Sequence, residues 1–179
     1  MTSISILPIL FFALQGGTSA TMIAQKHPLP SHCQVHEEKV FSCQIQKSNK
    51  VLSLCAVSGK ANNSGYLHYR FGRPGYVELQ YPQGVQDSYS KFRWQTIAYS
   101  GGWDTRIQFS NAGHRYQVYD RAYKIDIKHK DRSGGVLVFK GPKKLAELKC
   151  AANSFGADPY AWGLNDLYER VPEGAFFSD

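Results

Sequence analysis

The sequence lacks several features that would point to common functions. No charged residue occurs before Lys26, the four cysteines include no Cys-x-x-Cys pair, and no Gly-x-Ser-x-Gly motif is present. Without close cysteine pairs a zinc site is not expected, and without an assembled nucleophile, base and orienting group neither is an active site. We therefore expect a protein that is not an enzyme and that uses no metal and no cofactor.

The uncharged N-terminus contains one apolar run, Ile4–Leu14, followed by small residues that end at Ala20. This run is too short to span a membrane and has the pattern of a secretory signal peptide over residues 1–20. The mature chain is expected to begin at Thr21, with Gln25 as the alternative. No cysteine follows the run, so we expect no membrane anchor and a periplasmic or secreted protein. Residues 21–38 then form an N-terminal lead, and residues 39–179 form a single β-rich domain.

The cysteines agree with export, because an even number in an exported chain predicts disulfides. They are Cys33, Cys43, Cys55 and Cys150. Three pairings are possible. Cys43 and Cys55 flank a turn at 47–50, so we expect them to face each other across a hairpin, which leaves Cys33 to pair with Cys150.

The net charge is +7, yet the basic residues are scattered, and none of the nucleic-acid recognition motifs is present. An anionic partner or surface is therefore plausible on charge alone, whereas nucleic acid is not expected. The six histidines lie in the lead or within and beside strand patterns, at spacings that do not suit a metal site.

The body of the chain consists of short alternating segments separated by turns, which is typical of antiparallel sheets. We predict an all-β fold, an antiparallel β-sandwich or flattened barrel of about eight strands with a short C-terminal helix. The helix is expected over 162–171. Turns are expected at 72–75, at 110–113 and at 131–135, where the last one leads into a strand at 136–139.

One tip differs from the other turns. The loop at 99–104 combines a small hydroxyl, two glycines and a tryptophan, which suits insertion into an acid-lined cleft that binds carbohydrate. The ordinary alternative is a hairpin tip with a tucked tryptophan. The candidate target-binding residues are Tyr99, Ser100, Gly101, Gly102, Trp103 and Asp104.

Several motifs in the region 40–150 resemble the bacterial periplasmic inhibitors of lysozyme, most closely those that act on the invertebrate-type enzyme. They are Phe41-Ser42-Cys43, Val51-Leu52-Ser53-Leu54-Cys55, the stretch from Tyr66 to Pro82, Ser100-Gly101-Gly102 and Tyr116-x-Val118-Tyr119. In that family a Ser-Gly-x-Tyr loop enters the lysozyme cleft and contacts its catalytic acids.

The resemblance implies that Ser100 and Gly101 match the family loop, that Gly102 fills its free position, and that Trp103 stands where tyrosine is expected. The expected partner is therefore a lysozyme, with its class and the oligomeric state of this chain left open. The alternative function is a carbohydrate-binding or cell-envelope-associated module that uses exposed aromatic residues.

Overall fold

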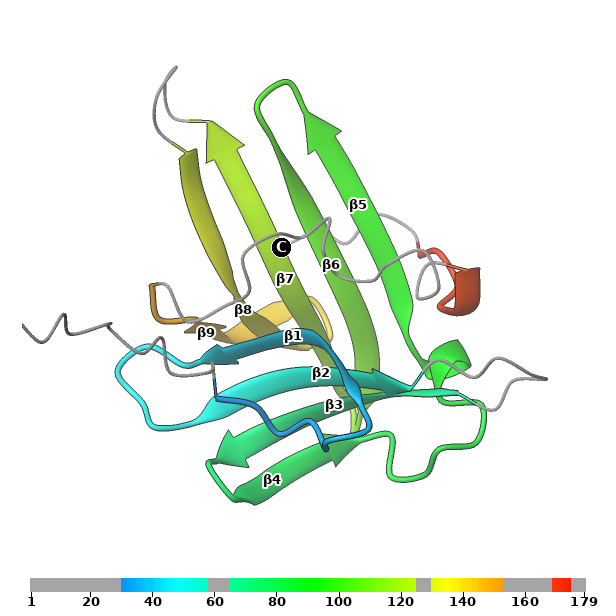
Figure 1. Ribbon diagram of the computed structural model, residues 1–179. Helices are drawn as coiled ribbons and strands as arrows, with labels where there is room; N and C mark the ends of the chain where they lie inside the picture. Colours follow the sequence, from blue (N-terminus) through cyan, green and yellow to red (C-terminus); the bar gives the residue numbers. More distant parts are fainter. Residues whose placement is uncertain (1–29, 58–64, 125–129, 153–168, 175–179) are drawn as a thin grey trace, which may run out of the picture.

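The computed structural model describes residues 30–57, 65–124, 130–152 and 169–174. The expected signal peptide lies outside these residues. The described chain folds into two antiparallel sheets, one of four strands and one of five (Figure 1). The strands are β1 (Glu38–Gln44), β2 (Val51–Val57), β3 (Tyr66–Arg73), β4 (Tyr76–Tyr81), β5 (Arg93–Tyr99), β6 (Gly102–Asn111), β7 (His114–Lys124), β8 (Lys130–Lys140) and β9 (Lys143–Lys149).

Each sheet is a meander in which consecutive strands are neighbours. Two of the expected turns are confirmed. Gly75, with φ of 76°, closes the β3–β4 hairpin after Pro74, and the β6–β7 hairpin turns at Ala112 and Gly113, which both have positive φ. The segment between the two sheets contains only the short 3₁₀ helix η1 (Tyr89–Lys91).

The main core lies between the two sheets, which both contribute buried side chains to it. At its centre the Phe109 ring is stacked between Tyr81 and Tyr116, with centroid distances of 4.6 and 4.8 Å. Tyr69 and Phe92 pack against the same ring. Since Phe109 is a β6 residue, this aromatic cluster fixes the position of the strand that carries the candidate tip.

Two disulfides form, but the expected pairing is wrong. The bonds join Cys33 to Cys55 and Cys43 to Cys150. The register of β1 with β2 explains the error, because Cys43 lies opposite Leu52 on the core side of the sheet whereas Cys55 lies on the other side. Because Cys150 follows the last strand, its bond to Cys43 ties the C-terminal part of the domain to the N-terminal part.

The outer face of the four-stranded sheet is covered by the chain that precedes β1. Glu37 forms two hydrogen bonds with the Arg70 guanidinium, at 2.5 and 2.8 Å, and its side chain is fully buried. Burial raises the pKa of Glu37, but hydrogen bonds from Arg70, Gln34 and Tyr66 and the charge of Arg70 outweigh it and lower the pKa to about 2. Residues 30–37 of the expected lead are thus part of the folded body.

A second correction concerns the turn expected at 131–135. These residues lie inside β8, which pairs with β7 from Lys130 onward. Their glycines serve packing: a Cβ on Gly134 would stand 3.1 Å from the Phe41 ring, and one on Gly135 would stand 2.3 Å from the Leu148 carbonyl oxygen. The expected C-terminal helix falls mostly outside the described residues. Within it, Glu169 and Arg170 are helical and Val171 is buried in the core between the sheets.

Among the described residues, no helix has both the length and the apolar character needed to cross a membrane.

Candidate functional site

The candidate tip is the turn of the β5–β6 hairpin. Tyr99 pairs with Gly102, so that Ser100 and Gly101 form a two-residue connection. This hairpin extends well beyond the four-stranded sheet, with the turn at its far end (Figure 1). The backbone N–H of Lys124 donates to the carbonyl oxygen of Gly101 at 2.9 Å, which fixes the turn to the end of β7. Ser100 is exposed. The structure therefore presents a small hydroxyl at the end of a hairpin whose turn is hydrogen-bonded to β7.

Both glycines of the tip are required by close packing and not by the turn conformation. Neither Ser100 nor Gly101 has a positive φ, in contrast to Ala112 and Gly113 at the other end of β6. A Cβ on Gly101 would stand 2.7 Å from the Lys124 Cβ, and one on Gly102 only 1.7 Å from the Ala122 carbonyl oxygen. The two glycines thus allow β6 and β7 to approach each other closely at the tip.

The two aromatic residues of the loop point to opposite faces of the sheet, because side chains alternate along a strand. Trp103 shares the core-facing side of β6 with Ile107 and Phe109; it is half-buried, and its indole nitrogen is buried. Tyr99 lies on the outer face and is 45% exposed. The aromatic side chain that the tip offers to a partner is therefore Tyr99 more than Trp103.

Asp104 lies on the outer face but is buried, at 2% exposure. Its carboxylate accepts hydrogen bonds from Nε and Nη2 of Arg106 at 3.0 and 2.8 Å. Arg106 also donates to Gln117, which donates in turn to Gln108. This network holds β6 and β7 together below the tip, so Asp104 supports the hairpin from inside and does not face solvent.

Tyr123 is not indicated by the sequence pattern, but the structure places it beside Tyr99. Gly102 lies between them in one cross-strand row, and the two rings meet above it with centroids 5.6 Å apart. Tyr123 is 39% exposed. Burial raises its pKa, as do Asp104 and a hydrogen bond with Tyr99. In the sequence, this pair is visible only as two tyrosines whose strands flank a glycine, Gly102, on the strand between them. The pair can be recognised only once the register of the three strands is known.

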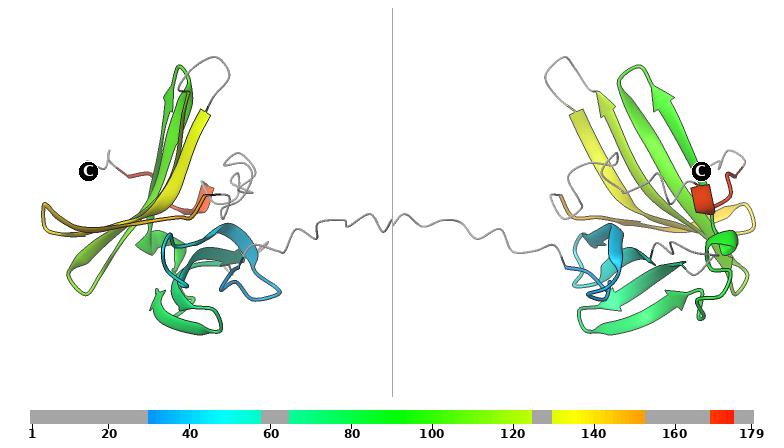
Figure 2. Two further views of the ribbon diagram at one scale, coloured as in Figure 1. Left: turned by 90° about the vertical axis from the view of Figure 1, so that its left-hand side faces the viewer. Right: turned by 45° about the vertical axis from the view of Figure 1, so that its right-hand side comes forward.

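Further along the outer face, arginines cover aromatic rings. The Arg121 guanidinium lies 4.8 Å from the centroid of Tyr119, and that of Arg115 lies 4.4 Å from Phe139. The Tyr119 hydroxyl donates to Glu147 at 2.9 Å, and burial together with this hydrogen bond raises the pKa of Tyr119. Figure 2 shows that the sheet carrying these residues is strongly curved.

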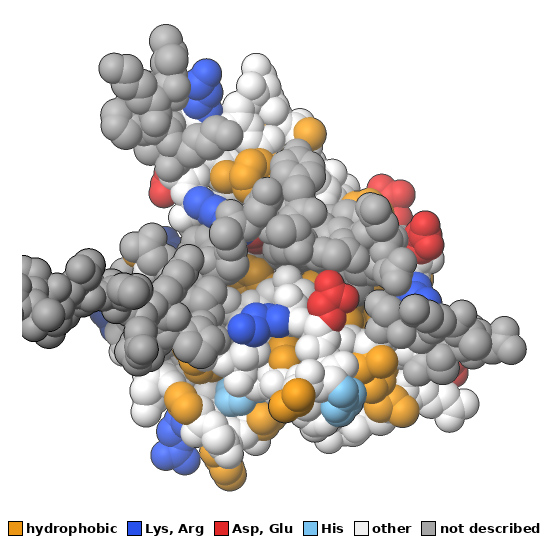
Figure 3. Space-filling model, viewed as in Figure 1, with side chains coloured by type: hydrophobic (Ala, Val, Ile, Leu, Met, Phe, Trp, Pro, Cys, Tyr) orange, Lys and Arg blue, Asp and Glu red, His pale blue; other side chains and the backbone are white. Residues whose placement is uncertain are grey.

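One cluster of potential metal ligands is already bonded within the protein. Cys33, Cys55 and Glu37 have ligand atoms within 4.8 Å of one another, but the two sulfurs are bonded together and Arg70 holds the carboxylate. Among the described residues on the molecular face seen in Figure 3, basic side chains stand apart and form no continuous patch.

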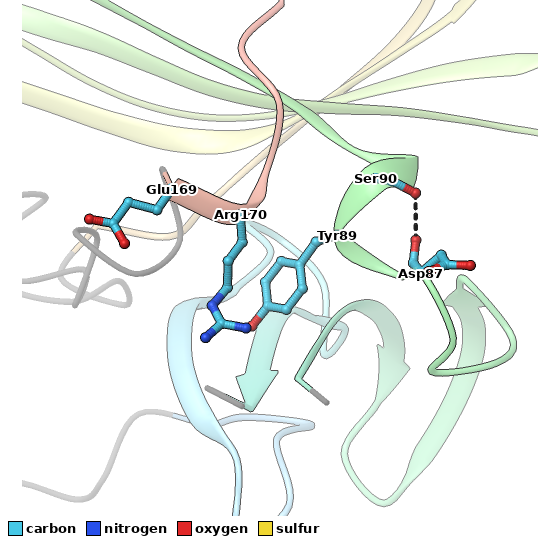
Figure 4. A pocket seen from close by; sticks show the side chains of 5 residues that line it. All are labelled: Asp87, Tyr89, Ser90, Glu169 and Arg170. Carbon is cyan, nitrogen blue, oxygen red and sulfur yellow. Dashed lines mark hydrogen bonds between the residues drawn. The ribbon is translucent and has the colours of Figure 1, made fainter. Parts of the chain in front are cut away.

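A polar pocket of about 210 Å³ lies beside η1 (Figure 4). In it the Arg170 guanidinium lies 5.6 Å from the centroid of the Tyr89 ring, and Ser90 donates to the backbone oxygen of Asp87 at 2.7 Å. Glu169 is the fifth residue of its lining. These side chains include no nucleophile with an adjacent base, so the pocket does not point to a reaction.

The chain matches no protein-family model, no curated protein and no solved structure.

Proposed function

We propose that this protein is an exported inhibitor of lysozyme that blocks the substrate cleft with the tip of the β5–β6 hairpin, residues 99–104. The observation that carries the proposal is the exposed Ser100 on a two-residue turn that is fixed to β7 and extends beyond the four-stranded sheet. The motifs that resemble the lysozyme inhibitors include this serine and the glycine after it.

The mechanism is occlusion of the cleft. The Ser100 hydroxyl donates a hydrogen bond to a carboxylate of the enzyme, and such charge-assisted bonds are among the stronger ones that a neutral side chain makes. Because the turn is already rigid, little conformational freedom is lost on binding. Tyr99 contacts one wall of the cleft from the outer face, and Trp103 supports the tip from the core-facing side. Asp104 acts indirectly, through its ion pair with Arg106.

The two disulfides suggest an oxidising, non-cytoplasmic compartment, and a sandwich-like frame of two sheets gives the hairpin a rigid base. A periplasmic or secreted inhibitor fits both features.

The test is an inhibition panel against invertebrate-type, chicken-type and goose-type lysozymes at low and high salt. We expect inhibition of at least one class, most readily the invertebrate type. Ser100→Arg should abolish it, because the larger side chain prevents the turn from reaching the carboxylates. Tyr99→Ala should weaken inhibition about thirtyfold, which corresponds to about 2 kcal/mol for a central aromatic contact.

The matched control is Ala112→Arg. It adds the same side chain to an exposed two-residue turn at the opposite end of β6 and should leave inhibition unchanged. Absence of inhibition in the whole panel, or full inhibition by the folded Ser100→Arg variant, would refute the proposal.

A further inference from the structure

A second candidate site lies just below the tip, on the outer face of the five-stranded sheet. It consists of Tyr99, Tyr123 and Arg121, which we call the tyrosine–arginine surface. The two rings form a pair over Gly102, and Arg121 is the next residue of β7 that faces the same side.

The acidic groups around this surface are largely paired. Asp104, the cross-strand neighbour of Arg121, is held by Arg106. Glu147 is shared among three basic side chains: the nitrogens of Arg121, Lys144 and Lys149 lie 3.7, 4.0 and 3.9 Å from its oxygens.

Asp131 pairs with Tyr123 in the β7–β8 register and is an exposed acid beside the rings. The two carboxylates Glu147 and Asp131 stand against the three cations Arg121, Lys144 and Lys149, which leaves an excess of one positive charge among these groups. Lys144 and Lys149 are about half exposed.

We propose that the tyrosine–arginine surface binds an acidic oligosaccharide. A pyranose ring has an apolar C–H face that packs against exposed aromatic rings, and a paired set of tyrosines on rigid strands provides such a surface at little entropic cost. The Arg121 guanidinium lies over Tyr119, donates through Nε to Ser133 and has Nη2 3.7 Å from Glu147. Its planar set of donors matches a sugar carboxylate or sulfate, which would replace the contact with Glu147. Lys149 and Lys144 extend the attraction to further acidic units of the chain.

The same observations favour a glycan over other polyanions. The disulfides suggest an oxidising compartment, where nucleic acid is an uncommon partner. An acidic peptide would use the cations but has no need of two neighbouring tyrosines. Tyr99 is shared with the proposed inhibitory contact, but Tyr123 and Arg121 have no part in it, so variants at these two residues test glycan binding separately from lysozyme inhibition.

The experiment measures binding of three probes to the full mature protein by titration calorimetry: a hyaluronan hexasaccharide, chitohexaose as the uncharged sugar of equal length, and a hexaglutamate peptide as an anion without sugar rings. We expect the hyaluronan hexasaccharide to bind at least about tenfold more tightly than the other two, and its affinity to fall with salt. Equal binding of the two sugars, equal binding of the peptide, or no binding of hyaluronan would each overturn the proposal.

Variants test the residues. Arg121→Gln and Tyr123→Ala should each weaken hyaluronan binding about tenfold or more. The matched controls come from the β3–β4 hairpin, where Arg73 lies 5.4 Å from the centroid of Tyr76 and both side chains are exposed. Arg73→Gln and Tyr76→Ala should leave binding unchanged. Equal losses in the controls would refute the assignment of the site.

The two proposals fail separately. Ser100→Arg should abolish lysozyme inhibition and leave hyaluronan binding unchanged. Arg121→Gln should leave lysozyme inhibition unchanged and weaken hyaluronan binding. Arg121→Gln also removes the contacts of Arg121 with Tyr119 and Ser133. A milder variant is therefore added, Tyr123→Phe, which retains the ring and the fold. It should retain most of the binding, and a loss as large as that of Tyr123→Ala would contradict ring stacking.

Discussion

The two sheets protect their outer faces in different ways. The four-stranded sheet is closed by another part of the chain: residues before β1 are joined to it by the Cys33–Cys55 bond, by the ion pair of Glu37 with Arg70, and by a hydrogen bond from the His32 N–H to Ser53. The five-stranded sheet is covered by its own side chains, with arginines lying over aromatic rings. The first arrangement buries its charges, whereas the second leaves cations and tyrosines accessible.

This difference indicates that the four-stranded sheet serves stability and the five-stranded sheet serves binding. Covering a sheet with a cross-linked segment raises stability but removes the surface from contact with partners. A face on which guanidinium groups lie over aromatic rings can exchange those contacts for contacts with a ligand. We therefore expect substitutions in the four-stranded sheet to change stability, and substitutions near the β5–β6 tip to change binding.

The largest expected effect is the loss of Cys43–Cys150, which closes a loop of 107 residues and joins the two sheets. Replacing both cysteines with alanine should lower the free energy of unfolding by about 5 kcal/mol, against about 3 kcal/mol for the Cys33–Cys55 pair, whose separation is 22 residues. Chemical denaturation of the two double variants measures the difference. The reverse order would show that closure of the outer face contributes more than the link between the sheets.

The disulfide pairing is a feature that the sequence alone did not determine. Symmetry about a turn predicted Cys43–Cys55, but in the actual register Cys43 lies opposite Leu52, three residues before Cys55, so the two cysteines lie on opposite faces of the hairpin. The actual turn pairs Gln44 with Val51, which fixes the alternation differently. Which faces meet is decided by packing between the sheets, and a single sequence carries no direct record of it.

The strand pattern of the sequence predicted the fold class better than it predicted the site. Alternation of side chains predicted an antiparallel all-β fold, as found. The glycines were ambiguous, because Gly134 and Gly135 suit a turn as well as a crowded strand and only the neighbouring strand distinguishes the two. For the same reason the sequence did not indicate Tyr123, because its position beside Tyr99 depends on the pairing of β5, β6 and β7.

The second prediction concerns the buried charge of the four-stranded sheet. Since the pKa of Glu37 is about 2 in the folded protein and 4.5 ordinarily, the unfolded chain binds the proton more tightly. The stabilising contribution, about 3 kcal/mol, is fully present above pH 4.5 and is lost as the pH falls toward 2. Urea denaturation across this range should show the loss.

Glu37→Gln is the informative variant. It should be less stable at neutral pH by about 3 kcal/mol, because Arg70 stays buried without its counter-charge. It should also lose that part of the pH dependence. Unchanged acid sensitivity in the variant would assign the effect to other carboxylates.

A smaller effect is expected where the five-stranded sheet is most crowded. Gly102→Ala places a Cβ against the Ala122 carbonyl oxygen and should lower stability by about 2 kcal/mol. Gly101→Ala meets the Lys124 Cβ at 2.7 Å, a smaller overlap than the 1.7 Å at Gly102, and should cost less. Thermal denaturation measures both. A Gly102→Ala variant as stable as the parent would show that the tip can shift away from β7, contrary to a rigid hairpin.

The smallest effect is expected at the tip itself, where a pair of serines makes the comparison sharp. Ser42 is buried in the four-stranded sheet and donates to the Pro30 carbonyl oxygen at 2.7 Å, so Ser42→Ala should cost about 1–3 kcal/mol by leaving buried partners unsatisfied. Ser100 is exposed, and Ser100→Ala should change stability by less than about 0.5 kcal/mol. If the exposed serine stabilised the fold as much as the buried one, the tip would be part of the structural frame. A neutral Ser100→Ala that inhibits lysozyme more weakly would instead assign the hydroxyl to recognition.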